Sequence, residues 1–256
     1  MPELTIERLG AQGDGVASGP VFVARALPGE AVEGDVVEGR MDAPRIIEPS
    51  PARVKAPCAH YKACGGCAVQ HASDDLVADW KRGLVQHAMA QHGVEAEVLA
   101  PITSPAAARR RVGISARRTK SGALAGFHGR KSETIVDVQH CHVLDPALAP
   151  AFDIARHLAR TGASRSAELS VMATASLDGL DVAVIGGKPL EPSQQAELGL
   201  YCGAHGIARL TWNDEVIGLR HPPRQACGPA HVVPPPGAFL QATEHAQTVL
   251  QDAVLA

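Results

Sequence analysis

The segment that decides how this chain is organised is Cys58-Ala-His-Tyr-Lys-Ala-Cys64-Gly-Gly-Cys67-Ala-Val-Gln-His71. Three thiols lie within ten residues, separated by five and then by two positions. Glycine permits tight backbone geometry, so Gly65 and Gly66 allow Cys64 and Cys67 to face one centre. A single cysteine is usually a small buried apolar residue, but packing alone does not call for this spacing. The segment therefore predicts a metal site.

The pattern leaves the metal and its fourth ligand open. Zinc sites usually combine two Cys-x-x-Cys pairs, or cysteines with histidines. An iron–sulfur cluster takes four thiolates, and the fourth can lie far away in the sequence. The candidates for a fourth thiolate are Cys141, Cys202 and Cys227.

Composition restricts the class of protein. The chain has 256 residues, enough for two domains or one large one, and a net charge of −3 at pH 7. No apolar run approaches the roughly 20 residues of a membrane span, and the first residues lack the basic and apolar regions of a secretory signal. Six cysteines, three of them clustered, suit metal ligation in a reducing compartment better than a disulfide framework. We therefore expect a cytoplasmic monomer that does not enter a membrane.

The first fifty residues predict a small β-barrel. Apolar stretches alternate with glycine turns, and strands are expected at 4–9, 20–23 and 31–37. Several short strands at this spacing favour a small antiparallel barrel. Three prolines between residues 49 and 57 then form a stiff linker, which places the first domain boundary at residue 50.

A helix is predicted directly after the cysteine segment. Between Asp74 and Gln91 the apolar residues recur at helical spacing, with Ser73 as the N-cap and Gly93 as the stop signal. Trp80 lies on this apolar stripe, and we expect it to pack in a core.

The middle of the chain is expected to be a mostly antiparallel sheet covered by helices, which is an α+β layer. From Arg109 the sequence period changes to two, so that Val112 and Ala116 point one way while Arg111 and Arg117 point the other. Further strands are expected at 123–128, 134–138, 169–175, 180–185, 208–212 and 216–220, and helices at 150–159 and 192–205.

The charge is unevenly distributed along the chain. Residues 98–132 contain eight basic residues and no acidic residue. A run of charge is usually only a solvated face, whereas a base that neutralises an RNA phosphate releases counterions and makes binding depend on salt. Small residues between Arg111 and Arg117 would let a nucleic-acid backbone approach this strand. The residues expected to contact RNA are Arg109, Arg110, Arg111, Arg117, Arg118 and Lys120.

The C-terminal part begins with a break. Pro234-Pro235-Pro236-Gly237 interrupts the chain, and a helix capped by Thr243 is expected to run to Ala256. Because this helix begins a new unit and nothing follows it in the sequence, we expect an incomplete protein.

Taken together, these motifs resemble one family, the S-adenosylmethionine-dependent RNA uracil-C5 methyltransferases, in their iron–sulfur, ribosomal-RNA branch. The resemblance runs from the N-terminus to Ala256, and the cysteine motif is its most specific part. The matching residues are Pro57-Cys58, Cys64-Gly65-Gly66-Cys67, Gln70-His71, Ser104-Pro105 before Arg109-Arg110-Arg111, Cys141 in Cys-His-Val-Leu-Asp-Pro, and Phe239-Leu240-Gln241.

The resemblance implies a fold class. It implies a TRAM-like, OB-type β-barrel at 1–50 and a central antiparallel-sheet α+β domain at 51–236 that holds a [4Fe–4S] cluster and binds RNA. The helix at 74–92 would pack on the catalytic domain. Residues 237–256 would be the first helix of a Rossmann-like methyltransferase domain that is otherwise missing.

The resemblance also implies site residues and an activity. It makes Cys141 the fourth cluster ligand beside Cys58, Cys64 and Cys67, and it matches Gln241 to a residue that contacts the methyl donor, S-adenosylmethionine. In this family a cysteine thiolate adds to C6 of uracil, C5 then takes the methyl group, and a carboxylate helps to remove the C5 proton. No residue of this chain matches the glycine-rich donor loop or that nucleophile, so no catalytic residue is expected here.

Two functions follow. In the first, the chain supplies cluster and RNA binding to a 23S rRNA uracil-C5 methyltransferase and is inactive alone. The alternative is a non-enzymatic RNA-binding module with a structural iron–sulfur or zinc site.

Overall fold

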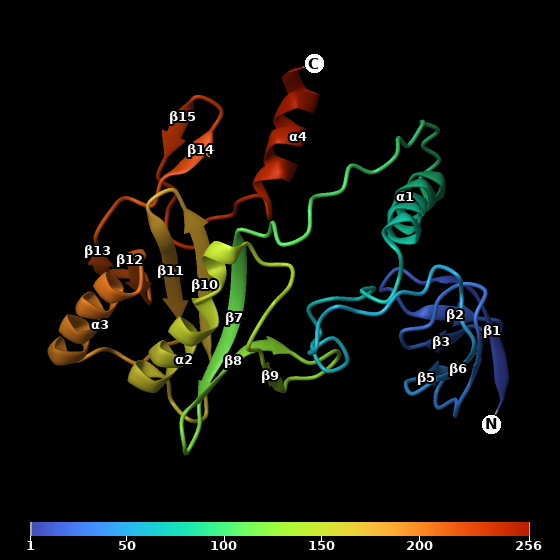
Figure 1. Cartoon of the computed structure of the whole chain (residues 1–256), viewed down its shortest axis with the longest axis horizontal. Helices are drawn as coiled ribbons and strands as arrows, with labels where there is room; N and C mark the ends of the chain where they lie inside the picture. The colour runs from blue at the N-terminus through green and yellow to red at the C-terminus, as the bar shows by residue number, and fades with distance from the viewer. Residues whose placement is uncertain (1, 256) are drawn as a thin grey trace. The chain divides into compact units, whose positions relative to one another are not determined.

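A computed structural model describes residues 2–255 and divides the chain into two compact units (Figure 1). Unit 1 comprises Met1–Lys62 and Gly66–Thr103, and unit 2 comprises Ala63–Gly65 and Ser104–Ala256. The boundary therefore runs through the cysteine segment. Over the described residues, no helix is both long and apolar enough to cross a membrane.

Unit 1 is built on a sheet of six short strands in the order β5-β3-β2-β1-β4-β6. Neighbouring strands are antiparallel except for β3 and β5, which are parallel. The strands predicted at 4–9 and 20–23 are confirmed, and the one predicted at 31–37 is shorter. Their bounds are β1 (Glu3–Leu9), β2 (Gly15–Ala17), β3 (Val21–Val23), β4 (Ala31–Glu33), β5 (Arg40–Met41) and β6 (Arg45–Glu48).

The proline-rich linker is fixed to unit 1 by a buried carboxylate. Glu30 is fully buried, and its side chain accepts hydrogen bonds from the backbone N–H groups of Leu27 and Ser50, at 2.8 and 3.1 Å. Arg53 donates to the same carboxylate at 2.7 Å and to the carbonyl of Arg25 at 2.8 Å. The chain that leads into the cysteine segment is therefore held to the sheet by a charge-assisted network.

Helix α1 (Asp74–Gln91) has the bounds that its periodicity predicts. The hydroxyl of Ser73 caps it by accepting from the N–H of Leu76 at 3.4 Å, and Gly93 follows its end with φ +66°. As predicted, Trp80 packs in a core. Its indole N–H donates to the carbonyl of Gly10 at 3.2 Å, and its ring packs in a small cluster with Leu9 that lies within unit 1.

Unit 2 is built on a seven-stranded sheet in the order β13-β12-β11-β10-β7-β8-β9. The prediction of a mostly antiparallel sheet is confirmed, although β11 and β12 pair in parallel. The reason is the helix between them, since a parallel pair requires a long crossover connection. The strands are β7 (Arg111–Arg118), β8 (Ala123–His128), β9 (Ile135–Asp137), β10 (Leu169–Ser176), β11 (Gly179–Ile185), β12 (Ile207–Trp212) and β13 (Glu215–Leu219), and a separate hairpin pairs β14 (Gln225–Cys227) with β15 (Ala230–Val232).

Two helices cover one face of this sheet and form its core (Figure 1). Helix α2 (Ala151–Gly162) follows the short 3-10 helix η1 (Pro146–Leu148), and α3 (Pro192–Ala204) makes the crossover from β11 to β12. Leu158 of α2 and Leu198 of α3 are fully buried in the same cluster. Helix α4 (Glu244–Leu255) follows the triple proline. On β7, Arg111 and Arg117 alternate with the residues that face this core.

Candidate functional site

The first part of the cysteine segment is held in place by its aromatic residue. The buried hydroxyl of Tyr61 lies 2.7 Å from the carbonyl oxygen of Ala68 and 2.6 Å from Nδ1 of His71. The backbone N–H of Tyr61 donates to the carbonyl of Cys58 at 3.1 Å. The histidine that ends the motif therefore braces, within unit 1, the loop carrying Cys58 and Cys67, whose side chains are both half-buried.

The other two predicted ligands lie in unit 2. Cys64 forms an isolated β-bridge with Gly129, and the N–H of Gly65 donates to the carbonyl of His128 at 2.9 Å. A Cβ atom at position 65 would lie 2.8 Å from that carbonyl oxygen, so glycine is required here by a close backbone approach. Cys141 is half-buried and packs against the main core of the unit.

The structure does not by itself assemble a metal centre. Across residues 2–255 there is no group of three or more His, Cys, Asp or Glu side chains placed to hold a metal ion. Of the two remaining cysteines, Cys202 is buried on α3, and burial raises the pKa of its thiol. Because metals bind the thiolate, this disfavours Cys202 as a ligand. Cys227 is exposed on β14.

Strand β7 carries the predicted basic stripe. Burial alternates along it as the sequence predicts, with Val112, Ile114 and Ala116 at most 4% exposed and the residues between them open or half-open. At its end Arg117 lies 3.9 Å from a carboxylate oxygen of Glu168. The next basic residues, Arg118 and Lys120, are exposed. This end of the strand presents the predicted RNA-contacting groups to solvent.

Arg110, which directly precedes β7, binds the segment that leads into α4. Arg110 is only 7% exposed, and its guanidinium donates to Oε1 of Gln247 at 2.6 Å and to the carbonyl of Gln241 at 3.4 Å. Its backbone N–H donates to the carbonyl of Ala242 at 2.9 Å. Arg110 therefore anchors the start of α4 to the central sheet, while Arg109 beside it is exposed.

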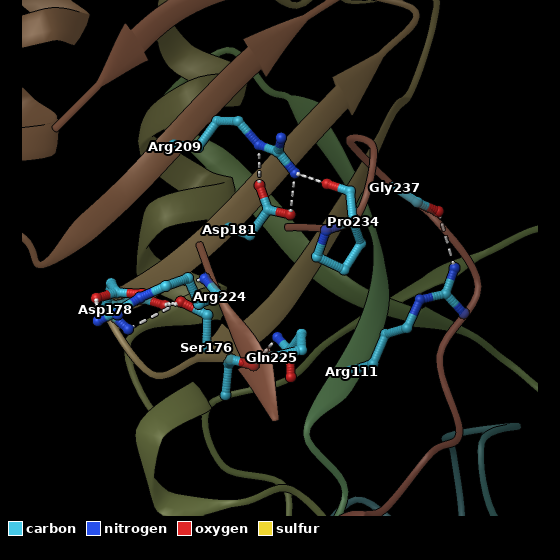
Figure 2. Close-up of polar contacts among 11 residues, drawn as sticks. Arg111, Ser176, Asp178, Asp181, Arg209, Arg224, Gln225, Pro234 and Gly237 are labelled. Carbon is cyan, nitrogen blue, oxygen red and sulfur yellow. Dashed lines mark hydrogen bonds and ion pairs between the residues drawn. The ribbon is translucent and has the colours of Figure 1, made fainter. Parts of the chain in front are cut away.

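The chain before α4 crosses the face of the sheet opposite α2 and α3, where arginines hold it (Figure 2). Arg209 donates to both carboxylate oxygens of Asp181 at 2.8 Å, and also to the carbonyl of Pro234 at 2.8 Å. Arg111 donates to the carbonyl of Gly237 at 3.2 Å. Arg111 is therefore partly occupied in fixing this segment.

Two further contacts position the hairpin β14–β15. The guanidinium and backbone N–H of Arg224 donate to the carboxylate of Asp178, and these hydrogen bonds lower the pKa of Asp178 to about 2. The side-chain amide of Gln225 donates to the carbonyl of Ala175 at 2.8 Å. Both residues are in view in Figure 2.

Gln241 lies where this hairpin meets α4. It lines a pocket of about 800 Å³ together with Cys227 and with residues along α4. The helix contributes apolar side chains to this pocket, and Leu250, Val254 and Leu255 are 51%, 85% and 84% exposed. The pocket is therefore partly apolar, and Gln241 is one of its polar lining residues.

Sequence reasoning missed the buried pair of Asp181 and Arg209, which are 7% and 8% exposed. A signal was present, since each is the single charged residue within an apolar strand. What places them together is the parallel register of β11 and β12, in which Asp181 is the partner of Arg209.

Comparison with known proteins shows relatives along the whole chain. No model of a protein family matches the sequence. An uncharacterised RNA methyltransferase of Rhizobium meliloti is 37% identical over 262 residues, which cover 99% of this chain and 63% of that protein. Another from Mesorhizobium japonicum is 35% identical over 253 residues, covering 98% of this chain and 61% of that protein.

The chain is thus similar over nearly its whole length to proteins named as RNA methyltransferases. It spans about three fifths of the length of the curated relatives named above. A more specific name comes from Aromatoleum aromaticum, whose 23S rRNA (uracil(1939)-C(5))-methyltransferase RlmD is 34% identical over 221 residues, covering 81% of this chain and 51% of that protein.

A solved structure shows the shared fold. The tRNA (uracil-54, C5)-methyltransferase of Pyrococcus abyssi, in complex with S-adenosyl-L-homocysteine, matches with a TM-score of 0.68 at 18% identity. The match covers 99% of this chain and 64% of that chain.

This match corrects the predicted fold class. The sequence predicts that residues 237–256 are the isolated first helix of a missing Rossmann-like domain, and that prediction is wrong. The methyltransferase fold matches 99% of the chain. The physical reason lies in the anchoring of α4, whose start is bonded to β7 through Arg110 and belongs to the same compact unit.

Proposed function

We propose that this protein acts in the methylation of uridine at C5 in RNA, with S-adenosylmethionine as the methyl donor and ribosomal RNA as the substrate. The observation that carries the proposal is the similarity to RNA methyltransferases along 98–99% of the chain. The named ribosomal-RNA relative supports the substrate, and the solved relative carries the demethylated form of the donor.

In this proposal the basic end of β7 binds RNA phosphates. Arg117, Arg118 and Lys120 are the best placed, because they lie at the solvent-facing end of the strand. Arg109, which precedes the other end of β7, is exposed as well and belongs to the proposed set. Arg110 and Arg111 would contribute less to RNA binding, since both donate hydrogen bonds to the segment before α4.

Gln241 is proposed to contact the methyl donor. Its place in the lining of a partly apolar pocket of about 800 Å³ supports this, because small-molecule sites are mostly apolar with a few placed polar groups. No residue of this chain matches the donor loop or the nucleophile of the resembled family. We therefore propose that these 256 residues alone bind RNA without transferring a methyl group.

Cys58, Cys64, Cys67 and Cys141 are proposed to hold a [4Fe–4S] cluster. The donor chemistry fits, because four half-buried cysteines can supply the four thiolates that such a cluster takes. A cluster with four protein thiolates and no open position would have a structural role. The protein's own contribution is to brace the loop through Tyr61 and His71.

Binding and transfer can be measured on the chain itself. Fluorescence anisotropy should show that the unaltered chain binds a fluorescein-labelled, uridine-containing RNA hairpin. The affinity of this binding should fall as the salt concentration rises. Arg117→Ala/Arg118→Ala should bind less tightly and with a shallower salt dependence, while Arg220→Ala serves as a control for the loss of an exposed charge. Unchanged RNA binding in the double variant would indicate that Arg117 and Arg118 are only a solvated charged surface and do not contact RNA.

Incubating the same RNA and the chain with radiolabelled S-adenosylmethionine tests whether the 256 residues transfer a methyl group. We expect no methyl transfer by the 256 residues, and measurable turnover would overturn the assignment of no catalytic residue to this chain. The alternative, a non-enzymatic RNA-binding module, would be favoured if cells without the gene kept all of their 5-methyluridine.

A further inference from the structure

The topology of unit 2 brings cations from three separate segments together at one end of three neighbouring strands, β7, β10 and β11. In the register of β7 with β10, Ala116 pairs with Leu169, and in that of β10 with β11, Ser170 pairs with Ile185. The end of β7, the start of β10 and the end of β11 therefore lie side by side. Chain just beyond these ends forms a pocket of about 530 Å³ lined by Arg118, Ala163, Ser164, Arg165, Ser166 and Lys188.

The lining of this pocket is basic without a compensating acid. Three of its six lining residues are cations, and all three are exposed. Within the described part of the chain, none of Arg118, Arg165 and Lys188 forms an ion pair. Glu168 and Glu191 each lie three positions from a lining cation in sequence, and neither lines the pocket. Glu168 lies 2.9 Å from His128 and 3.9 Å from Arg117, and the side chain of Glu191 caps the start of α3. The pocket therefore carries a local positive charge.

The loop that forms one wall is ordered by its own hydrogen bonds. Oγ of Ser164 accepts from the backbone N–H groups of Ser166 and Ala167 at 3.2 and 2.8 Å. The C-terminal end of α2, whose carbonyls would repel an anion, is partly neutralised. The carbonyl of Gly162 accepts from the N–H of Lys188 at 3.0 Å, and that of Thr161 accepts from Gln194 at 3.0 Å.

We propose that this pocket binds a phosphate group of the RNA backbone, held by Arg118, Arg165 and Lys188. This inference rests on the proposed function and extends its RNA surface to two cations far from the basic stripe in sequence. Guanidinium groups match phosphate oxygens with two parallel hydrogen bonds, and lysine adds a point charge. The pocket adjoins the basic end of β7 because Arg118 belongs to both.

The test compares charge-matched variants of the whole chain. Arg165→Ala/Lys188→Ala removes two pocket cations, and Arg160→Ala/Arg220→Ala removes two exposed arginines that do not line the pocket. Anisotropy with the labelled RNA hairpin is measured between 50 and 200 mM salt. Each phosphate contact contributes about 0.7–0.9 to the slope of log K against log salt. Because the pocket is proposed to hold one phosphate, the pocket variant should lose about 0.7–0.9 from that slope. Its loss of affinity between 50 and 200 mM salt should therefore be about threefold smaller than that of the unaltered chain.

The outcomes separate the pocket from the wider function. If the unaltered chain binds RNA and the pocket variant keeps the same slope as the control, the pocket does not hold a backbone phosphate. If the unaltered chain binds no RNA at all, the proposed function fails and this proposal fails with it. The third measurement is phosphorus NMR of inorganic phosphate added to each protein. If the pocket variant alone fails to bind inorganic phosphate while its RNA binding is unchanged, the pocket binds a free anion and the proposal is overturned.

Discussion

Replacing Arg209 by methionine should destabilise unit 2 through the carboxylate left behind. Asp181 and Arg209 are 7% and 8% exposed and share two hydrogen bonds of 2.8 Å. Removing one member of a buried ion pair leaves an uncompensated charge, which costs about 3–5 kcal/mol. The variant also removes the hydrogen bond to Pro234, so the segment that leads to Gln241 should become more mobile.

A second variant separates the charge from the packing. Asp181→Leu/Arg209→Met removes both charges, and replacing a buried pair by apolar residues is often nearly neutral. Only the carbonyl of Pro234 then loses a partner, which costs about 1–2 kcal/mol. The double variant should therefore be more stable than Arg209→Met by about 2 kcal/mol or more.

Urea unfolding followed by tryptophan fluorescence measures these free energies. Trp212 lies on β12, the strand that carries Arg209, and the other tryptophan, Trp80, lies in unit 1. A Trp80→Phe background therefore makes the signal report on unit 2. A cost below about 1 kcal/mol for Arg209→Met, or a double variant no more stable than the single one, would contradict this prediction, because removing one partner of a buried ion pair costs more than that.

Three other predictions concern titration and metal content. Burial raises the pKa of Glu30, but hydrogen bonds from Arg53 and from backbone N–H groups outweigh it and lower the pKa below 4.5. Glu30→Gln should therefore lower the free energy of unfolding by about 2 kcal/mol near neutral pH, as measured by urea unfolding. This difference between variant and unaltered protein should disappear as the pH falls below 4.5 and through the lowered pKa. A difference that persists in acid would contradict the prediction. Burial lowers the pKa of His157 from 6.5, so the folded state resists protonation and stability should fall as the pH drops below 6.5. His157→Phe should keep the stacking on Tyr201, whose ring centroid lies 3.8 Å away, and flatten this fall in thermal melts, whereas an unchanged pH profile would count against it. Protein purified without oxygen should be brown and contain iron and sulfide, with loss of iron in Cys141→Ser but not in Cys227→Ser; stoichiometric zinc in a colourless protein would exclude the cluster.

The sequence predicts those elements whose pattern is local. Helix α1 and strand β8 have the predicted bounds because their period, caps and turns lie within one short window. The alternation of β7 likewise shows which residues face the core. Each of these features depends on neighbours a few positions away.

Features set by tertiary contact could not be predicted in the same way. Arg110 and Arg117 look alike in sequence, yet Arg110 is buried against the start of α4 and Arg117 faces solvent in part. The parallel pairing of β11 and β12 depends on the path of α3. The cations at 165 and 188 reach Arg118 only through the register of three strands. In each case the decisive partner is distant in the chain.

We propose that this protein acts in C5 methylation of uridine in RNA. The most direct test of this proposal is nucleoside mass spectrometry of ribosomal and transfer RNA from cells with and without the gene. We expect one 5-methyluridine to disappear from 23S rRNA when the gene is deleted and to return with the intact gene, while the 5-methyluridine of transfer RNA stays unchanged. Unchanged 5-methyluridine in every RNA fraction would contradict it.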